Sequence, residues 1–280
     1  LTYFPSPTFI IRFYTDVWFL KNEKEKCPMK KYLSIVLVMM LLALSTVYAQ
    51  QQVDNKTEPA FDPTVSQASA STPEAVSVSS TAALKAVLAD KTVKTISIDS
   101  IGTPVVVTGE FTIPAGVIIT VNRGNDFYIE GTLINNGIIN VMGADSYTAD
   151  FINYSVMAVQ KGGKIINNGR LRLCASVIGD EEDRGPVGGQ LRVFDGSFEN
   201  KGFVYLESGR VNTHGGVAFV IGGTFNNSAT VVVDGFFFRI EGGSFINNKS
   251  AVVLNNTNIF VENEGVFTNN GMLSGAEVNQ

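Results

Sequence analysis

Short apolar runs of three or four residues recur along the chain from about residue 100 to its end. Residues 127–129, 132–134 and 138–141 are examples, rich in Val, Ile and Phe and separated by Gly or Asn. Run length and residue type favour β-strands. No stretch past residue 100 shows the sustained apolar spacing at i, i+3, i+4 and i+7 that an amphipathic helix requires. The pattern predicts an all-β fold of many short strands.

A repeated block of the form Gly-x-apolar-x-Asn runs through the same region. Its apolar residues are Leu133, Ile165, Phe198, Phe225, Phe245 and Phe267, and its asparagines are Asn135, Asn167, Asn200, Asn227, Asn247 and Asn269. Successive asparagines lie 32, 33, 27, 20 and 22 residues apart, so the shortest gaps indicate a unit of roughly 20 to 22 residues. A four-stranded propeller blade needs about 40 to 45 residues. The repeat therefore predicts one solenoid coil with three short strands and three turns.

The longer gaps between asparagines indicate insertions of about 11, 11 and 5 residues relative to this unit. Two insertions are visible in the sequence, at the polar and irregular residues 143–154 and at residues 179–189, which read GDEEDRGPVGG. Insertions of this kind map to loops on one face of a stacked array.

The apolar residue and the Asn of each block lie two positions apart, so on a strand both side chains face the same way. A buried amide needs hydrogen-bond partners. Coils stacked about 4.8 Å apart would supply them, because each Asn could donate to one neighbouring Asn and accept from the other. The alternative is that these asparagines are turn residues, since Asn tolerates a left-handed backbone. Both interpretations are structural.

The repeated blocks make the chain resemble the right-handed parallel β-helix proteins, which include pectate-lyase-like enzymes and bacterial surface adhesins. Residues 82–90 (AALKAVLAD) and 92–98 (TVKTISI) look like the helix and first strand that cap such solenoids, and residues 113–121 are typical of their opening coils. The resemblance covers about residues 81–280. It implies a right-handed parallel β-helix of about eight coils with a short N-terminal capping helix. It does not specify an activity, because one fold hosts many functions.

The front of the chain reads as a targeting segment. In residues 29–49, Lys30 and Lys31 precede an apolar run of about 13 residues and a small-residue cleavage site that ends at Ala49. A membrane anchor is the alternative, but a span needs about 20 apolar residues. We therefore predict a signal peptide at 29–49, secretion, and a non-native upstream leader at 1–28. Residues 50–80, rich in Gln, Ser, Thr, Ala and Pro, are expected to form a flexible linker.

Net charge limits the kinds of partner that the chain can bind, and cysteine content limits its disulfide bonds. From Gln50 onward the chain has 15 Lys and Arg against 23 Asp and Glu, a net charge of −8. This acidic balance, without a basic cluster, argues against a nucleic-acid partner. Cys174 is the one cysteine of the predicted mature chain, so an internal disulfide is excluded there. Its position after Leu171 and Leu173 favours a buried packing residue over a reactive thiol.

Candidate chemistry is sparse. A lyase of the resembled group would gather acidic calcium ligands on neighbouring coils, and no such column is visible. Residues 180–183 (DEED) are interpreted as a solvated loop, with a weak Ca²⁺ site as the alternative. His214 is the only histidine and is expected in a turn, so it forms neither a zinc set nor a catalytic triad. No pair of glycosidase carboxyl groups stands out among Asp195, Glu199, Glu207, Asp234 and Glu241. No catalytic residue and no cofactor is predicted.

Alternation along the strands also assigns an outer surface. Leu171, Leu173, Val204, Leu206, Val231 and Val233 are expected to face inward. The outward set is then Arg170, Arg172, Phe203, Tyr205, Thr230, Val232, Ser250 and Val252. At least one ring of residues 236–238 (FFF) should also face solvent. A slip of one residue at a turn would reverse these faces. We take Arg170, Arg172, Phe203 and Tyr205 as the candidate ligand-binding residues, because exposed apolar patches often mark recognition surfaces.

Three functions remain open. The favoured hypothesis is a non-enzymatic, adhesin-like secreted or cell-surface protein that binds a glycan or a surface protein along a sheet face, with no membrane span in the mature chain. The second is a polysaccharide lyase or glycoside hydrolase of the pectate-lyase-like fold. The third is a structural spacer. Several carboxylates in one groove would favour the enzyme, and a flat aromatic face would favour the binder.

Overall fold

A computed structural model describes residues 74–145, 147–148, 151–178, 187–209, 215–275 and 278–279 of the chain. The described residues belong to one compact unit, Ser71–Gln280. The predicted leader at 1–28, the signal peptide at 29–49, most of the linker at 50–80, the loop at 180–183 and His214 lie outside the described residues. Within the described part of the chain, no helix is long and apolar enough to cross a membrane.

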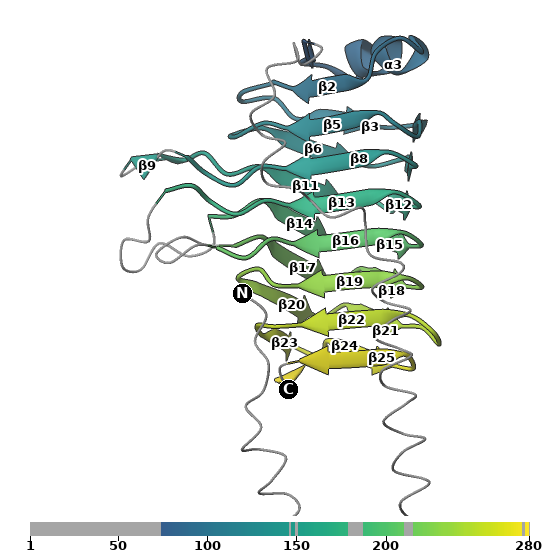
Figure 1. The fold of residues 1–280 in the computed structure, drawn as a ribbon, viewed down its shortest axis with the longest axis vertical. Coiled ribbons are helices and arrows are strands. Elements are labelled where there is room, and N and C mark those ends of the chain that lie inside the picture. Colours follow the sequence, from purple (N-terminus) through teal and green to yellow (C-terminus); the bar gives the residue numbers. More distant parts are fainter. Residues whose placement is uncertain are drawn as a thin grey trace, which may run out of the picture. The chain divides into compact units, whose positions relative to one another are not determined.

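Three parallel sheets form the structure, and each coil contributes one strand to each sheet (Figure 1). Sheet A contains, in spatial order, β1 (Val76–Val78), β2 (Thr95–Ile98), β5 (Ile118–Val121), β8 (Ile138–Val141), β13 (Arg170–Leu173), β16 (Phe203–Leu206), β19 (Thr230–Val233), β22 (Val252–Asn255) and β25 (Met272–Gly275). Sheet B contains β3 (Val105–Val107), β6 (Asp126–Ile129), β11 (Val156–Val159), β14 (Gln190–Val193), β17 (Val217–Ile221), β20 (Phe237–Glu241), β23 (Ile259–Glu262) and β26 (Val278–Asn279). Sheet C contains β4 (Glu110–Ile113), β7 (Thr132–Asn135), β12 (Lys164–Asn167), β15 (Ser197–Asn200), β18 (Thr224–Asn227), β21 (Ser244–Asn247) and β24 (Val266–Asn269).

The chain passes from sheet A to sheet B to sheet C and then enters the next coil, as a right-handed parallel β-helix (Figure 1). Seven coils have all three strands, and an eighth has the sheet A and sheet B strands β25 and β26 among the described residues. The predicted all-β solenoid of about eight coils, with three short strands in each, is confirmed.

The core lies inside the coils, where inward side chains of successive strands stack in register. In sheet C the column runs through Phe198, Phe225, Phe245 and Phe267, which are paired strand to strand. Their ring centroids lie 4.6, 4.9 and 5.3 Å apart, and all three pairs are stacked. The six residues of sheet A that were expected to face inward are all buried. Each coil therefore buries its apolar side chains against the coils on either side, as expected for a solenoid.

Helix α3 (Thr81–Ala89) covers the first coil, as predicted. Ser80 is its N-cap, and the Ser80 hydroxyl accepts a hydrogen bond from the Ala83 amide at 3.2 Å. Leu84 is fully buried against the core. Strand β1 comes before the helix, within the range 50–80 that was expected to be linker, and pairs in parallel with β2. Its Val-Ser-Val sequence is too short to display an alternation that marks a strand.

Three long connections join sheet A to sheet B, so they leave and re-enter the solenoid at the same corner (Figure 1). They join β8 to β11, β13 to β14 and β16 to β17, and so they belong to three consecutive coils. The first carries the antiparallel pair β9 (Tyr147–Thr148) and β10 (Phe151–Ile152). The insertions visible in the sequence at 143–154 and 179–189 both fall at this corner. The strands therefore stay in register inside the solenoid, although the connections at this corner differ in length from coil to coil.

Candidate functional site

The six repeat asparagines lie at the ends of the sheet C strands, where they form a continuous hydrogen-bonded ladder. The Nδ2 atom of each donates to the Oδ1 atom of the next, over distances of 2.7, 2.9, 2.8, 2.9 and 2.8 Å from Asn135 to Asn269. Each Nδ2 from Asn135 to Asn247 also donates to a backbone carbonyl of the following coil, such as that of Phe203 or Thr230. The side chains from Asn135 to Asn247 are buried. The ladder is a structural device of the core and not part of a binding surface.

The predicted ligand-binding residues lie together on the outer face of sheet A. Arg170 pairs in register with Phe203, and Arg172 with Tyr205, on the adjacent strands β13 and β16. The Arg170 guanidinium carbon lies 5.6 Å from the centroid of the Phe203 ring, within range of a cation–π contact. The Phe203 and Tyr205 rings are 6.4 Å apart and tilted by 40°. We call these four residues the sheet A stripe.

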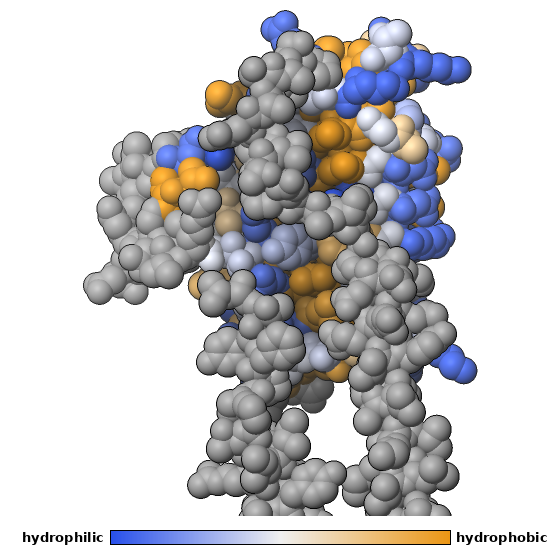
Figure 2. Space-filling view, in the orientation of Figure 1, coloured by the Kyte–Doolittle hydropathy of each residue, from blue (hydrophilic) through white to orange (hydrophobic). Residues whose placement is uncertain are grey.

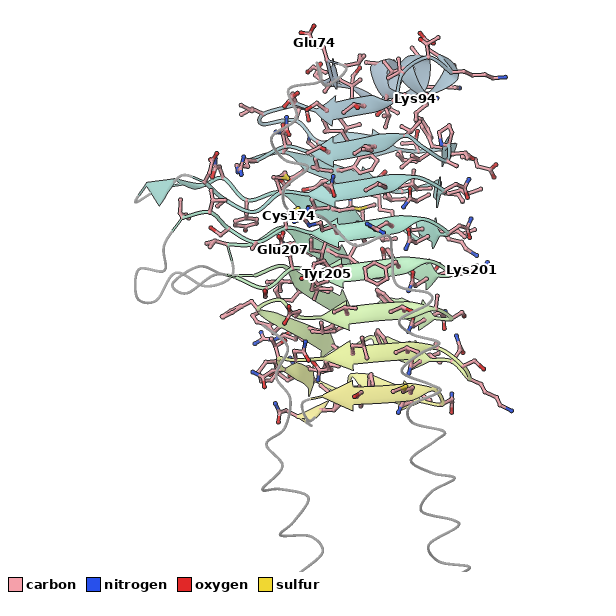
Figure 3. The ribbon with its side chains drawn as sticks, in the orientation of Figure 1. Glu74, Lys94, Cys174, Lys201, Tyr205 and Glu207 are labelled. Atoms are coloured by element: carbon pink, nitrogen blue, oxygen red, sulfur yellow. The ribbon has the colours of Figure 1, made fainter. Side chains whose placement is uncertain are left out.

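Ion pairing fixes one end of the stripe. The Arg172 Nη2 atom lies 2.5 Å from Glu207 Oε1, and the Ala175 amide donates to Glu207 Oε2 at 3.1 Å. Figure 3 shows Tyr205 beside Glu207, with Cys174 one coil away. Burial raises the pKa of the Tyr205 hydroxyl, and the charges of Asp234 and Glu207 raise it further. Tyr205 therefore presents a neutral ring and a hydroxyl that can donate a hydrogen bond at physiological pH.

The expected set of outward residues is wrong at Ser250, which lies in a turn outside the strands. Val252 and Leu254 occupy the outer positions of β22, in register with Thr230 and Val232. The turn after Asn247 is two residues longer than the turn after Asn227, and Ser250 takes up the extra length with a positive φ of 71°. Counting from the ladder Asn therefore misplaced the outer positions of this coil by two residues, while the inward and outward faces stayed correct.

Cys174 is a buried free thiol at the end of β13. Burial raises its pKa to about 11, with the Arg172 charge acting in the opposite direction. At pH 8 the thiolate fraction is therefore about a hundredfold lower than for a cysteine with a pKa near 9. This agrees with the predicted packing role.

We expect Cys174 in the folded protein to resist alkylation by iodoacetamide at pH 8, and to react only after unfolding in urea. Peptide mass spectrometry of the labelled chain would locate the modified thiol. Rapid labelling of Cys174 in the folded state would contradict a buried, protonated thiol.

Acidic side chains are dispersed over different faces. Glu199 on sheet C lies 2.5 Å from Lys164 Nζ and 3.2 Å from Lys201 Nζ, and these partners lower its pKa. Glu241 on sheet B pairs with Arg239 at 3.4 Å. Among the described residues, no group of three or more His, Cys, Asp and Glu side chains converges on a common point. Figure 3 shows Lys201, an ion-pair partner of Glu199, and Glu207 at opposite ends of β16. Glu199 and Glu207 therefore do not share a groove.

The outer face of sheet B carries a second surface that sequence reasoning missed. One outward column runs, in register, through Tyr128, Ala158, Arg192, Phe219, Arg239 and Phe260. The Arg192 guanidinium carbon lies 5.8 Å from the Phe219 ring centroid, and that of Arg239 lies 5.9 Å from the Phe260 centroid. Aromatic and cationic side chains thus alternate along the column, with Ala158 as the exception. The residue types were visible in the sequence, but their alignment depends on the insertions between them.

A groove of about 400 Å³ opens on sheet B at Ala158. Its lining comes from β6, β11 and β14 and from Tyr154 in the first insertion. The Tyr128 hydroxyl donates to Asp126 Oδ2 at 2.9 Å. Burial raises the pKa of Tyr128 to about 12, and the hydrogen bond to Asp126 adds to this effect. On the opposite side, Arg192 donates twice to Gln190 Oε1, at 2.6 and 3.0 Å.

Phe236 is the exposed member of residues 236–238, as the sequence predicted. Its side chain is exposed, whereas Phe238 faces the core and Phe237 lies under Arg239, whose guanidinium carbon is 5.1 Å from the Phe237 ring centroid. Comparisons of the chain with protein-family models, with curated proteins and with solved structures find no match. The fold and the two outer faces are therefore the basis for any functional conclusion.

Proposed function

We propose that the chain is a secreted or cell-surface β-solenoid that binds a glycan or a surface protein along the outer face of sheet A, in the manner of an adhesin and without catalysis. One observation carries this proposal: Phe203 and Tyr205 lie two residues apart on the outer face of sheet A, in register with Arg170 and Arg172. Planar rings with one polar end suit a ligand that offers both apolar faces and hydroxyl groups.

The rest of sheet A supports an extended contact. Its outer positions include apolar side chains on both sides of the stripe, among them Ile118, Ile138, Val232, Val252 and Leu254, all partly exposed. Figure 2 shows apolar side chains gathered over parts of this face. A stacked array presents such a surface over many coils, which is how solenoids form extended binding faces. Exposed apolar groups of this kind are typical of recognition surfaces.

The dispersed carboxylates favour binding over hydrolysis or elimination. Glycoside hydrolysis needs two carboxyl groups at a defined separation across the substrate. Glu199, Glu207 and Glu241 instead lie on different parts of the coil, and each is engaged by a basic side chain. These ion pairs indicate that the three carboxylates stabilise the fold.

We expect Tyr205→Ala to weaken binding of the preferred ligand about tenfold, because a lost ring contact is worth on the order of 1.4 kcal/mol. A glycan array screened with the purified chain, with and without calcium, would identify the ligand and test the calcium alternative. Titration of the variant with that ligand would measure the loss.

Thr112→Ala is the control, because Thr112 is exposed on sheet C, outside the sheet A face. It should leave the affinity unchanged. Equal binding by wild type and Tyr205→Ala would remove the sheet A stripe as the site. Release of unsaturated sugar products from a bound polysaccharide would contradict the non-catalytic part of the proposal.

A further inference from the structure

The groove on sheet B is one strand wide, and a single small side chain creates it. Ala158 lies between Tyr128 and Arg192 in register, and its side chain is 1% exposed at the floor of the groove. Because adjacent strands lie about 4.8 Å apart, the strands that carry the two walls are separated by roughly 9.6 Å. The space left above the methyl group is therefore about the thickness of one inserted ring.

The adjoining coils show what this position holds elsewhere. Beyond Arg192 the same column is filled by Phe219, Arg239 and Phe260, which stack as alternating rings and guanidinium groups. Arg239 also lies 5.1 Å from the Phe237 ring centroid. At Ala158 the alternation is interrupted, and the groove lies above its covered methyl group, between Tyr128 and Arg192. A ring placed there would continue the stack in both directions.

The rim of the groove adds polar groups that can recognise hydroxyls. Asp126 accepts from Tyr128, which orients its carboxylate at one wall. The two bonds of Arg192 to Gln190 use its Nε and Nη2 atoms, so the Nη1 side of the guanidinium has no hydrogen-bond partner among the described residues. Gln160, which directly follows the floor strand β11, also lines the groove, and its side-chain amide donates to Glu130 Oε1 at 3.0 Å. Planar carboxylate and guanidinium groups can each engage two neighbouring hydroxyls of one ring.

The charges of the walls select against an ionised ligand. Asp126 and Arg192 carry opposite charges on opposite sides, so the groove has no net charge from these two groups. A uronate would meet the carboxylate of Asp126, and an amine would meet Arg192. An uncharged ring with several hydroxyls satisfies both walls, whereas an aromatic protein side chain would leave the polar rim unpaired.

We propose that the Tyr128–Ala158–Arg192 groove on sheet B is a binding site for a single neutral hexose unit of a glycan, which inserts between the Tyr128 ring and the Arg192 guanidinium. The site is on a different sheet from the stripe of the proposed function and does not depend on it. It adds a groove that selects one sugar unit to a protein whose sheet A carries the stripe on its outer face.

The test uses the full-length chain, labelled with ¹³C at the alanine methyl groups, and the neutral disaccharides maltose, cellobiose and lactose. At least one of them is expected to shift the Ala158 methyl resonance at concentrations up to about 10 mM, because the methyl group forms the floor of the groove. Digalacturonic acid should bind at least about tenfold more weakly than that disaccharide.

Substitutions distinguish binding in this groove from a nonspecific effect of changing the protein surface. Ala158→Leu fills the groove and should weaken binding at least about tenfold in calorimetric titration, whereas Ala158→Ser keeps it open and should retain affinity. Thr112→Leu places the same side chain at an exposed position of sheet C and should have no effect. If Ala158→Leu fails to fold by circular dichroism, Arg192→Met removes one wall without filling the groove, and it should also weaken binding.

Three results would overturn the proposal. One is the absence of a shift at Ala158 with all three neutral disaccharides. Another is equal affinity in Ala158→Leu and wild type. The third is a shift caused by N-acetyltyrosinamide and by none of the sugars, which would assign the groove to an aromatic protein side chain. Tyr205→Ala should leave disaccharide binding in the groove intact, so failure of the sheet A proposal remains distinguishable from failure here.

Discussion

Replacing Phe225 with alanine is expected to lower the free energy of unfolding by about 4 kcal/mol. The side chain is fully buried, and its ring lies between Phe198 and Phe245 at centroid distances of 4.6 and 4.9 Å. Phe238 contacts it edge to face at 5.6 Å. Alanine would therefore remove three ring contacts and leave a cavity in the middle of the column. Urea unfolding followed by circular dichroism would measure the loss.

Phe236→Ala is the control for this experiment, since it removes the same group from a surface position. Phe236 is 39% exposed, so its truncation should cost roughly 1 kcal/mol or less. A loss below about 1.5 kcal/mol for Phe225→Ala would show that the stacked phenylalanines do not form the core. It would then also remove the structural basis for the registers that define both outer faces.

Replacing Asn200 with alanine is expected to cost about 3 kcal/mol, although the change removes no large apolar group. The fully buried Asn200 accepts from Asn167 Nδ2 at 2.9 Å and donates to Asn227 Oδ1 at 2.8 Å and to the Thr230 carbonyl at 3.0 Å. Its Oδ1 also accepts from the Gly202 amide. Alanine would leave several of these buried groups without a partner, and each carries a desolvation cost of about 1 to 3 kcal/mol.

Asn168→Ala provides the matched control, because Asn168 is an exposed asparagine that directly follows a ladder position, Asn167. Its side chain makes one exposed hydrogen bond, to Asn136 Oδ1 at 2.9 Å. Its loss should change the stability by less than about 0.5 kcal/mol. If the two substitutions had equal effects, the buried ladder would contribute no more than a surface turn.

Asn200→Asp adds a test by pH. The introduced carboxyl group would be buried and would face two acceptors, Asn227 Oδ1 and the Thr230 carbonyl. Both factors disfavour the ionised form, so the pKa of this carboxyl group in the folded state should lie above its unfolded value of about 4. Unfolding then releases a proton, and the variant should become less stable, relative to wild type, as the pH rises from about 4 to about 7. A pH-independent difference would contradict the burial of this position.

The repeat made most of the fold predictable because the same local pattern recurs at a nearly constant period. Gly-x-apolar-x-Asn marks each sheet C strand, and alternation assigns its inner side. The stacked Phe column and the inward residues of sheet A follow from this pattern. The prediction was wrong at Ser250, where two additional turn residues shifted the outer positions of β22 without changing the period of the strands.

The candidate sites were predictable to different degrees. Arg170, Arg172, Phe203 and Tyr205 could be placed together because the turns after Asn167 and Asn200 have the same length, so a count of residues aligned their strands. Tyr128, Ala158 and Arg192 lie in segments separated by insertions of unequal length, so no count aligned them. Backbone pairing between β6, β11 and β14 brings them into one column.

By itself the sequence determined the coil length, the three-stranded unit, the capping helix and the side of each strand that faces the core. These features depend on local periodicity and on side-chain chemistry that repeats in every coil. Only the tertiary structure decided that the insertions share one corner, and that a small side chain interrupts the stacked column of sheet B. The reason is that hydrogen bonds between coils set the register of strands that lie about 30 residues apart in the chain. A local sequence pattern does not show which residues these bonds will pair.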